Sequence, residues 1–177
     1  WQTSDAKLIA AGGQAQCLID GAINRGALGV AAEALGLSQR MVDMTVSYTA
    51  DRQQFGKPIG SFQAVKHLMA NVAVKLEFAK TPVYKAAYAV AEQLSSANVN
   101  VSHAKRAATE VAQLAARNAM QCHGAMGYTW EVDLQIFMKK AWVYNNAWGV
   151  VAWHQGRVSD FVFADQAAIG PGSTFVA

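Results

Sequence analysis

Residues 61–91 read SFQAVKHLMANVAVKLEFAKTPVYKAAYAVA, and this stretch decides the fold. Its apolar residues recur in alternating steps of three and four: Phe62, Val65, Met69, Val72, Leu76, Ala79, Val83, Ala86 and Val90. This spacing predicts one long amphipathic helix that starts at an N-cap, Ser61, and is kinked at Pro82. Roughly 33 helical residues span about 50 Å, which fits a helical bundle and not a compact α/β domain.

Three further helices are predicted around this one. The first covers about residues 17–51 and ends before Pro58, which cannot continue a helix. The third covers about residues 102–123 and has an alanine-rich face that allows close approach of another helix. Thr129 can cap a fourth helix, which continues through a Trp-rich stretch to about Phe163. Four long helices with short connections predict an all-α fold, an antiparallel up-down four-helix bundle.

The segments outside the helices suggest the domain boundaries. Residues 6–11 form a short apolar stretch that reads as the last strand of a preceding domain, so we expect residues 1–13 to be the remnant of a β-domain or a linker. The bundle is expected to cover residues 14–164, and residues 165–177 an irregular C-terminal tail. Because the chain starts with Trp1, we also expect it to be a piece of a longer protein.

Composition excludes several classes of protein. Only 15% of the 177 residues are charged and 53% are apolar, which excludes a disordered chain and suggests apolar surface that a partner subunit covers. A net charge of +3 is too mild to argue for nucleic-acid binding. No apolar run is long enough to span a membrane. The two cysteines, Cys17 and Cys122, are expected to be small core residues of a reduced, cytoplasmic protein.

Two loops carry residues suited to ligand binding. The first joins the first two helices and carries Arg52, Gln53, Gln54 and Phe55, a set that suits a phosphate and its polar neighbours. The simpler interpretation is a solvated interhelical loop. The second, at residues 124–127, ends one helix and starts the next, which leaves free amide donors where an anion can bind. No pair of histidines has helical metal-ligand spacing and there is no Cys-x-x-Cys, so no metal site is predicted.

Both loops resemble motifs of one family. Residues 48–67 (YTADRQQFGKPIGSFQAVKH) and 121–131 (QCHGAMGYTWE) are similar, in the same order, to segments in the C-terminal helical domain of the flavin-dependent acyl-CoA dehydrogenases. The resemblance covers about residues 19–141. It implies α,β-oxidation of an acyl-CoA thioester with FAD, in a homo- or hetero-oligomer (dimer or tetramer) that holds FAD at the subunit boundary.

The resemblance also assigns residues to the cofactor. It implies that Arg52 and Gln63 reach the pyrophosphate and adenosine end of FAD, and that the second loop meets FAD from the neighbouring subunit. The family usually has glycine where this chain has Ala125. The complete set of implied FAD-binding residues is Arg52, Gln54, Phe55, Gln63, Gln121, Gly124 and Ala125.

The catalytic carboxylate of the family is missing. Its usual position falls on Trp148, and a minority position on the first helix falls near Gly26, with Glu33 two turns away. Neither an indole nor a glycine can remove a proton from carbon. Glu131 and Asp133 are interpreted as a helix cap and a solvent-facing residue, so no catalytic residue is predicted.

Two functions remain open. The chain is expected to be the base-lacking, FAD-holding part of a heteromeric acyl-CoA dehydrogenase, whose partner supplies the carboxylate. The alternative is a non-catalytic helical assembly or binding domain that has lost turnover. Retention of Arg52, Gln63 and Gln121 favours the first, because a scaffold has no need of phosphate-facing groups.

Overall fold

The computed structural model describes residues 7–164 and Gly170. Residues 7–11 belong to neither helix nor strand, so the strand expected at residues 6–11 does not form over its described part. The irregular tail expected at residues 165–177 lies outside the described residues except for Gly170. The proposed domain boundaries stay predictions.

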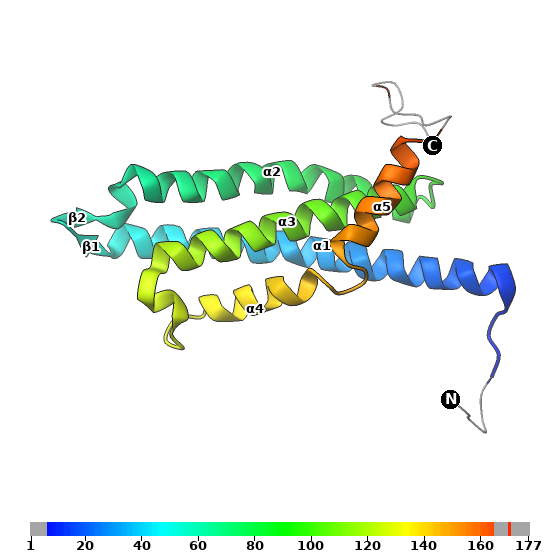
Figure 1. The fold of residues 1–177 in the computed structure, drawn as a ribbon, viewed down its shortest axis with the longest axis horizontal. Coiled ribbons are helices and arrows are strands. Elements are labelled where there is room, and N and C mark those ends of the chain that lie inside the picture. Colours follow the sequence, from blue (N-terminus) through cyan, green and yellow to red (C-terminus); the bar gives the residue numbers. More distant parts are fainter. Residues whose placement is uncertain (1–6, 165–169, 171–177) are drawn as a thin grey trace.

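Three long helices form the body of the molecule. α1 (Gly12–Asp51), α2 (Gln63–Ala91) and α3 (Ala97–His123) run side by side along the long axis, with α3 packed on both of the others (Figure 1). α4 (Leu134–Tyr144) packs on α3 and α1, and α5 (Val151–Val162) packs on α3 near its N-terminal end (Figure 1). The predicted all-α bundle is therefore confirmed.

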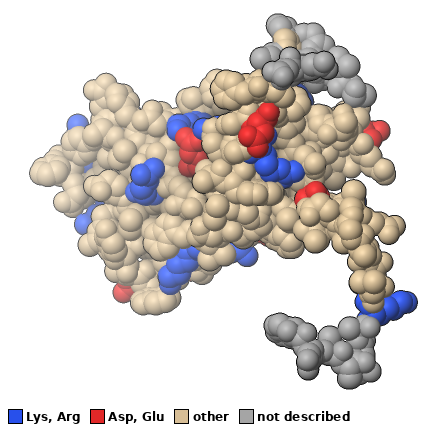
Figure 2. Space-filling view, turned by 45° about the vertical axis from the view of Figure 1, so that its right-hand side comes forward, with Lys and Arg blue, Asp and Glu red and all other residues tan. Residues whose placement is uncertain are grey.

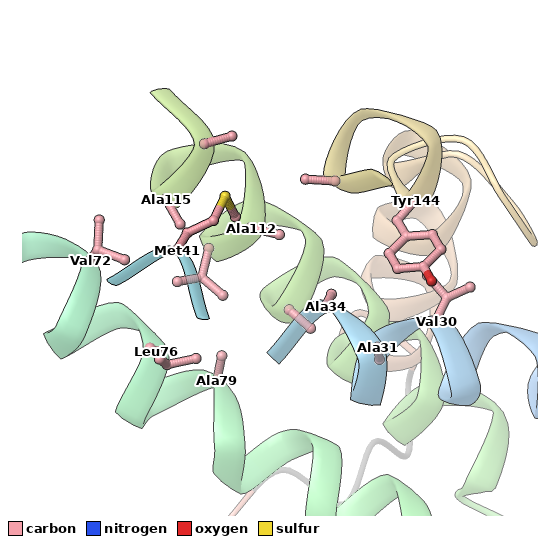
Figure 3. Packing of buried hydrophobic residues seen from close by; sticks show 14 of the residues in the cluster. Val30, Ala31, Ala34, Met41, Val72, Leu76, Ala79, Ala112, Ala115 and Tyr144 are labelled. Carbon is pink, nitrogen blue, oxygen red and sulfur yellow. The ribbon is translucent and has the colours of Figure 1, made fainter. Parts of the chain in front are cut away.

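The core is made of small side chains from α3 and larger ones from its neighbours. Met41 of α1 and Leu76 of α2 are fully or almost fully buried and lie beside the alanine face of α3 (Figure 3). Tyr144, at the end of α4, lies against Val30 of α1 (Figure 3). Alanines let the helix backbones approach closely, as the sequence predicted; the buried alanines of α3 are Ala104, Ala108, Ala112, Ala115, Ala116 and Ala119.

The predicted fourth helix is wrong in one respect, because it is broken into α4 and α5. The backbone leaves the helix after Tyr144 and reverses where Trp148 and Gly149 both have positive φ, 57° and 102°. Right-handed helix requires negative φ at every residue, so no helix can pass through these two positions.

The predicted caps and one predicted core residue are also wrong. α2 is capped at Phe62, and the Ser61 hydroxyl donates instead to the Pro58 carbonyl, 2.7 Å away. α4 begins after Asp133, not after Thr129. Cys17 is exposed, whereas Cys122 is buried as expected. α2 continues through Pro82 without a stop.

The surface carries few charges. Figure 2 shows Lys, Arg, Asp and Glu in small scattered groups on a mostly uncharged face. Within residues 7–164, no helix is long and apolar enough to cross a membrane.

Candidate functional site

A short hairpin projects from one end of the bundle (Figure 1). β1 (Gln53–Gln54) pairs antiparallel with β2 (Lys57–Pro58), and a one-turn 3-10 helix, η1 (Ile59–Ser61), leads into α2. The Arg52 amide donates to Tyr48 O over 2.9 Å, which ends α1 and starts the hairpin. η1 lies close to α1: a Cβ added at Gly60 would be only 3.0 Å from the Thr49 carbonyl oxygen.

The tip of the hairpin is strained and exposed. Phe55 and Gly56 both have positive φ, 54° and 76°, as a two-residue turn of type I′ requires. A phenylalanine rarely adopts this conformation, since its Cβ crowds the backbone there. The Phe55 side chain is nonetheless 91% exposed and touches Phe62 edge-on, with ring centroids 6.0 Å apart. Strain and exposure together indicate a side chain placed to meet something outside this bundle.

The polar residues predicted on this loop also face outward. Arg52, Gln54 and Gln63 are all exposed. Within residues 7–164 the Arg52 side chain makes no hydrogen bond or ion pair, while the Gln54 amide donates to the carbonyl of Gln53 over 2.7 Å. A free guanidinium beside an exposed aromatic ring can bind a diphosphate and stack on an adjoining planar group.

The second predicted loop lies at the same end of the bundle (Figure 1). α3 ends at His123, and Gly124 follows with φ 57° and ψ −134°, a conformation essentially restricted to glycine. The 3-10 helix η2 (Gly124–Tyr128) then leads toward α4. Gln121, Gly124 and Ala125 are all exposed.

A partly buried contact joins the ends of α1 and α3, the helices that lead into the two loops. The rings of Tyr48 and His123 stack with centroids 4.3 Å apart, and the Tyr48 hydroxyl donates to the His123 carbonyl over 3.4 Å. His123 Nδ1 in turn donates to Ala119 O over 2.8 Å. Burial lowers the pKa of His123, an effect that the Ala119 bond opposes. The structure thus places all seven predicted residues at one end without bringing the two loops into direct side-chain contact with each other.

The two positions predicted for a catalytic carboxylate meet elsewhere in the fold. Trp148 lies in the turn between α4 and α5, and its indole rests on Gly26 of α1. A Cβ added at Gly26 would be 2.6 Å from Trp148 Cε3 and closer still to two other ring atoms. The sequence suggested these positions separately, and their contact is a finding of the structure.

Two buried basic residues hold this turn, and sequence reasoning missed both. Lys105 donates to the carbonyl of Tyr144 over 2.6 Å, and His154 Nε2 to the carbonyl of Trp148 over 3.0 Å. Burial lowers the pKa of Lys105 to about 8. Burial lowers the pKa of His154 to about 4, and its bond to Trp148 O opposes that shift while Lys105 and Arg157 add to it. His154 is therefore neutral near pH 7.

Carboxylates contribute little to either region. No Asp or Glu among residues 7–164 is buried, and Glu33, Glu131 and Asp133 are all exposed. The same residues contain no group of three or more His, Cys, Asp or Glu that could hold a metal ion.

Comparison with known proteins gives a consistent set of relatives. Residues 17–159 match the family model described as acyl-CoA dehydrogenase, C-terminal domain. The chain is 38% identical over 121 residues to the acyl-CoA dehydrogenase IpdE2 of Mycolicibacterium smegmatis, an alignment that covers 68% of this chain and 37% of the relative.

Two solved structures show the same similarity in three dimensions. Butyryl-CoA dehydrogenase from Megasphaera elsdenii superposes with a TM-score of 0.83 at 28% identity, covering 88% of this chain and 40% of that one. The ChsE4-ChsE5 complex from Mycobacterium tuberculosis superposes with a TM-score of 0.76 at 25% identity, covering 86% and 41%. The chain thus spans about two fifths of the length of these relatives.

Proposed function

The chain belongs to the acyl-CoA dehydrogenase family, as its C-terminal helical domain, and from this we propose that it holds part of an FAD shared between two subunits. The observation that carries the proposal is the projecting hairpin. Arg52 has no side-chain partner among residues 7–164, and Phe55 is 91% exposed on a strained turn. Exposed, unpaired side chains on a strained turn contribute little to the core of their own domain, and they are available to bind a ligand or a neighbouring chain.

The residues present fit a dinucleotide. In the proposed arrangement the Arg52 guanidinium pairs with the diphosphate, and Phe55 and Gln63 border the adenosine. Gln121 and the open backbone at Gly124 approach the FAD of the neighbouring subunit. When bound, FAD accepts a hydride in acyl-CoA oxidation; this chain's own residues bind and orient it.

Exposed aromatic side chains next to η2 support an oligomer. Tyr128 and Trp130 are 77% and 78% exposed, and together with Trp142 they border an open cavity of about 340 Å³. Lys139 Nζ lies 4.1 Å above the centre of the Trp130 ring. Large aromatic residues gathered on a surface are typical of subunit contacts. This surface adjoins the loop that we propose meets the neighbour's FAD.

We further propose that this chain lacks the catalytic base and works beside a subunit that supplies it. Both positions that the resemblance gives for the carboxylate, Gly26 and Trp148, are occupied by non-acidic residues in mutual contact. The similarity to a complex of two differently named components, ChsE4 and ChsE5, supports a heteromer. The acyl-CoA substrate is proposed from family membership alone.

The test is flavin retention by the assembly purified with the subunits that associate with this chain. We expect the native assembly to be yellow and Arg52→Ala to bind FAD about 10- to 150-fold more weakly, because a charge-assisted hydrogen bond contributes about 1.5–3 kcal/mol. Arg40→Ala, at an exposed arginine within α1, is the matched control and should retain FAD.

Flavin content distinguishes the two functions. A colourless assembly that releases no flavin on denaturation would favour the alternative, a helical assembly domain without turnover. Equal flavin in wild type and Arg52→Ala after extensive dialysis would refute the proposed role of the hairpin.

A further inference from the structure

The turn between α4 and α5 is held from both ends by buried side chains that no other part of the site uses. Lys105 of α3 is fully buried and donates to the carbonyl of Tyr144, where the turn begins. His154 of α5 is also fully buried and donates to the carbonyl of Trp148, where the turn ends. Ser102 lies 3.0 Å from His154 Nδ1, and because Nε2 carries the proton, the Ser102 hydroxyl donates to Nδ1.

The burial of these groups is not explained by a gain in folding stability. Lys105 has no acidic partner within residues 7–164, and burial of an unpaired ammonium destabilises the folded state. What the ammonium does provide is a cation at the C-terminal end of α4, where the last carbonyls carry partial negative charge. Its bond therefore fixes the direction in which the chain leaves α4.

The backbone of the turn is strained in a way that these bonds explain. Trp148 has a φ of 57°, which an L-residue rarely adopts, and Gly149 follows at 102°. A Cβ at Gly149 would be 2.8 Å from His154 Nε2, so only glycine allows the histidine to reach the Trp148 carbonyl. Strained backbone persists only where surrounding contacts enforce it.

These contacts together determine where the indole of Trp148 lies. The Trp148 indole lies on the bare backbone of Gly26, and 51% of the residue stays exposed. An indole that is packed on one side and exposed on the other is not a core residue. It presents a fixed apolar surface to the solvent.

We propose that Lys105 and His154 are positioning residues that fix the Trp148 indole on Gly26, so that its exposed part forms a rigid apolar surface where the α4–α5 turn meets α1. The positioning does not depend on the proposed function. FAD and acyl-CoA play no part in its test, which can therefore fail separately from the flavin experiment.

The experiment is ¹⁹F NMR of the full chain labelled with 5-fluorotryptophan. The Trp148→Phe variant identifies the Trp148 line by its loss. We expect Lys105→Met and His154→Phe, which remove the donors, to move this line toward its position in the unfolded chain while the Trp130 and Trp142 lines stay in place. We expect His154→Gln to restore the native line, since the glutamine amide can donate from nearly the position of Nε2.

Lys75→Met is the matched control, because Lys75 is an exposed lysine paired with Glu110 on the surface. It should leave all tryptophan lines unchanged. A Trp148 line that stays in place in folded Lys105→Met and His154→Phe overturns the proposal. Unfolding of the whole bundle by both variants, or a uniform shift of all tryptophan lines, overturns it too, because either result assigns these residues a general structural role.

Discussion

Replacing Gly26 by alanine should destabilise a helix that alanine would ordinarily favour. At an open helical site glycine to alanine stabilises by about 0.5–1 kcal/mol. At Gly26 the new methyl group would overlap the Trp148 ring, which the strained turn prevents from moving freely. About half of Trp148 is buried, so expelling it exposes roughly 100 Å², or about 2.5 kcal/mol. The net expectation is a loss of about 1.5–2 kcal/mol.

The assay is urea unfolding followed by far-UV circular dichroism, with Gly29→Ala as the control. Gly29 lies one turn along α1 and has nothing within 4 Å of its added Cβ, so its replacement should stabilise by about 0.5–1 kcal/mol. The two substitutions are chemically identical and differ only in the neighbour that the methyl group meets.

A double-mutant cycle separates the contact from helix propensity. In the Trp148→Ala background the obstacle is gone, and Gly26→Ala should become stabilising by the same amount as Gly29→Ala. If Gly26→Ala raises the unfolding free energy of the wild-type chain as Gly29→Ala does, the indole does not rest on Gly26 and the reasoning is wrong.

Four further outcomes are expected. The pKa of His154 is about 4 in the folded chain and 6.5 ordinarily, so the unfolded chain binds a proton first as the pH falls. The free energy of unfolding should therefore decrease between about pH 6.5 and pH 4, by up to about 3 kcal/mol. His154→Gln should remove this part of the pH dependence in urea titrations, and identical profiles for the variant and the wild type would contradict it. Phe55→Asn creates an Asn-Gly turn, and should raise the unfolding free energy by about 1 kcal/mol while weakening FAD retention; lower stability would argue against strain at the tip. Gly127→Ala places a Cβ 3.0 Å from the Met120 carbonyl oxygen and should lower the melting temperature, unlike Gly36→Ala, whose site is open; equal melting temperatures would count against this close approach. The isolated 177-residue chain should not oxidise acyl-CoA with an artificial electron acceptor, and measurable turnover would refute that.

The long helices could be predicted because their apolar residues follow a single period. Of the stripe that predicted α2, Met69, Val72, Leu76, Ala79, Val83 and Ala86 are buried. Phe62, Val65 and Val90, near its two ends, are only half-buried. The period of the apolar residues predicts which face of the helix is covered. Burial of that face decreases toward the helix ends, where fewer neighbouring helices cover it.

The break between α4 and α5 could not be predicted from the local sequence alone, because a distant residue, Lys105 of α3, bonds to the end of α4. The stretch from Tyr144 to Val151 contains no proline, and its local turn signals are Asn145, Asn146 and Gly149. The turn is held by a bond from Lys105, which lies far away in the sequence on α3, and by a bond from His154, six residues beyond Trp148 on α5. Lys105 itself could have been found, since it falls on the same helical stripe as Val101, four residues earlier.

The candidate site could be predicted in its residues but not in its arrangement. The two motifs identified Arg52 and Gln121 by resemblance, and their roles in binding FAD stay predictions. The exposure of Phe55 on a strained turn, the ring stack of Tyr48 on His123 and the meeting of Gly26 with Trp148 all depend on tertiary contacts that a linear pattern does not contain.

The two loops together have a genetic consequence. Both lie at the same end of the bundle (Figure 1), so under the proposed sharing a lesion at Arg52 impairs the FAD site of its own subunit, whereas a lesion at Gln121 impairs the FAD site of the neighbour. Two alleles damaged on opposite sides of one boundary would then restore a single intact pocket in a mixed assembly. Dilution that separates the subunits would then release FAD from both subunits together. Reassociation of the subunits would limit the rate at which FAD binding recovers.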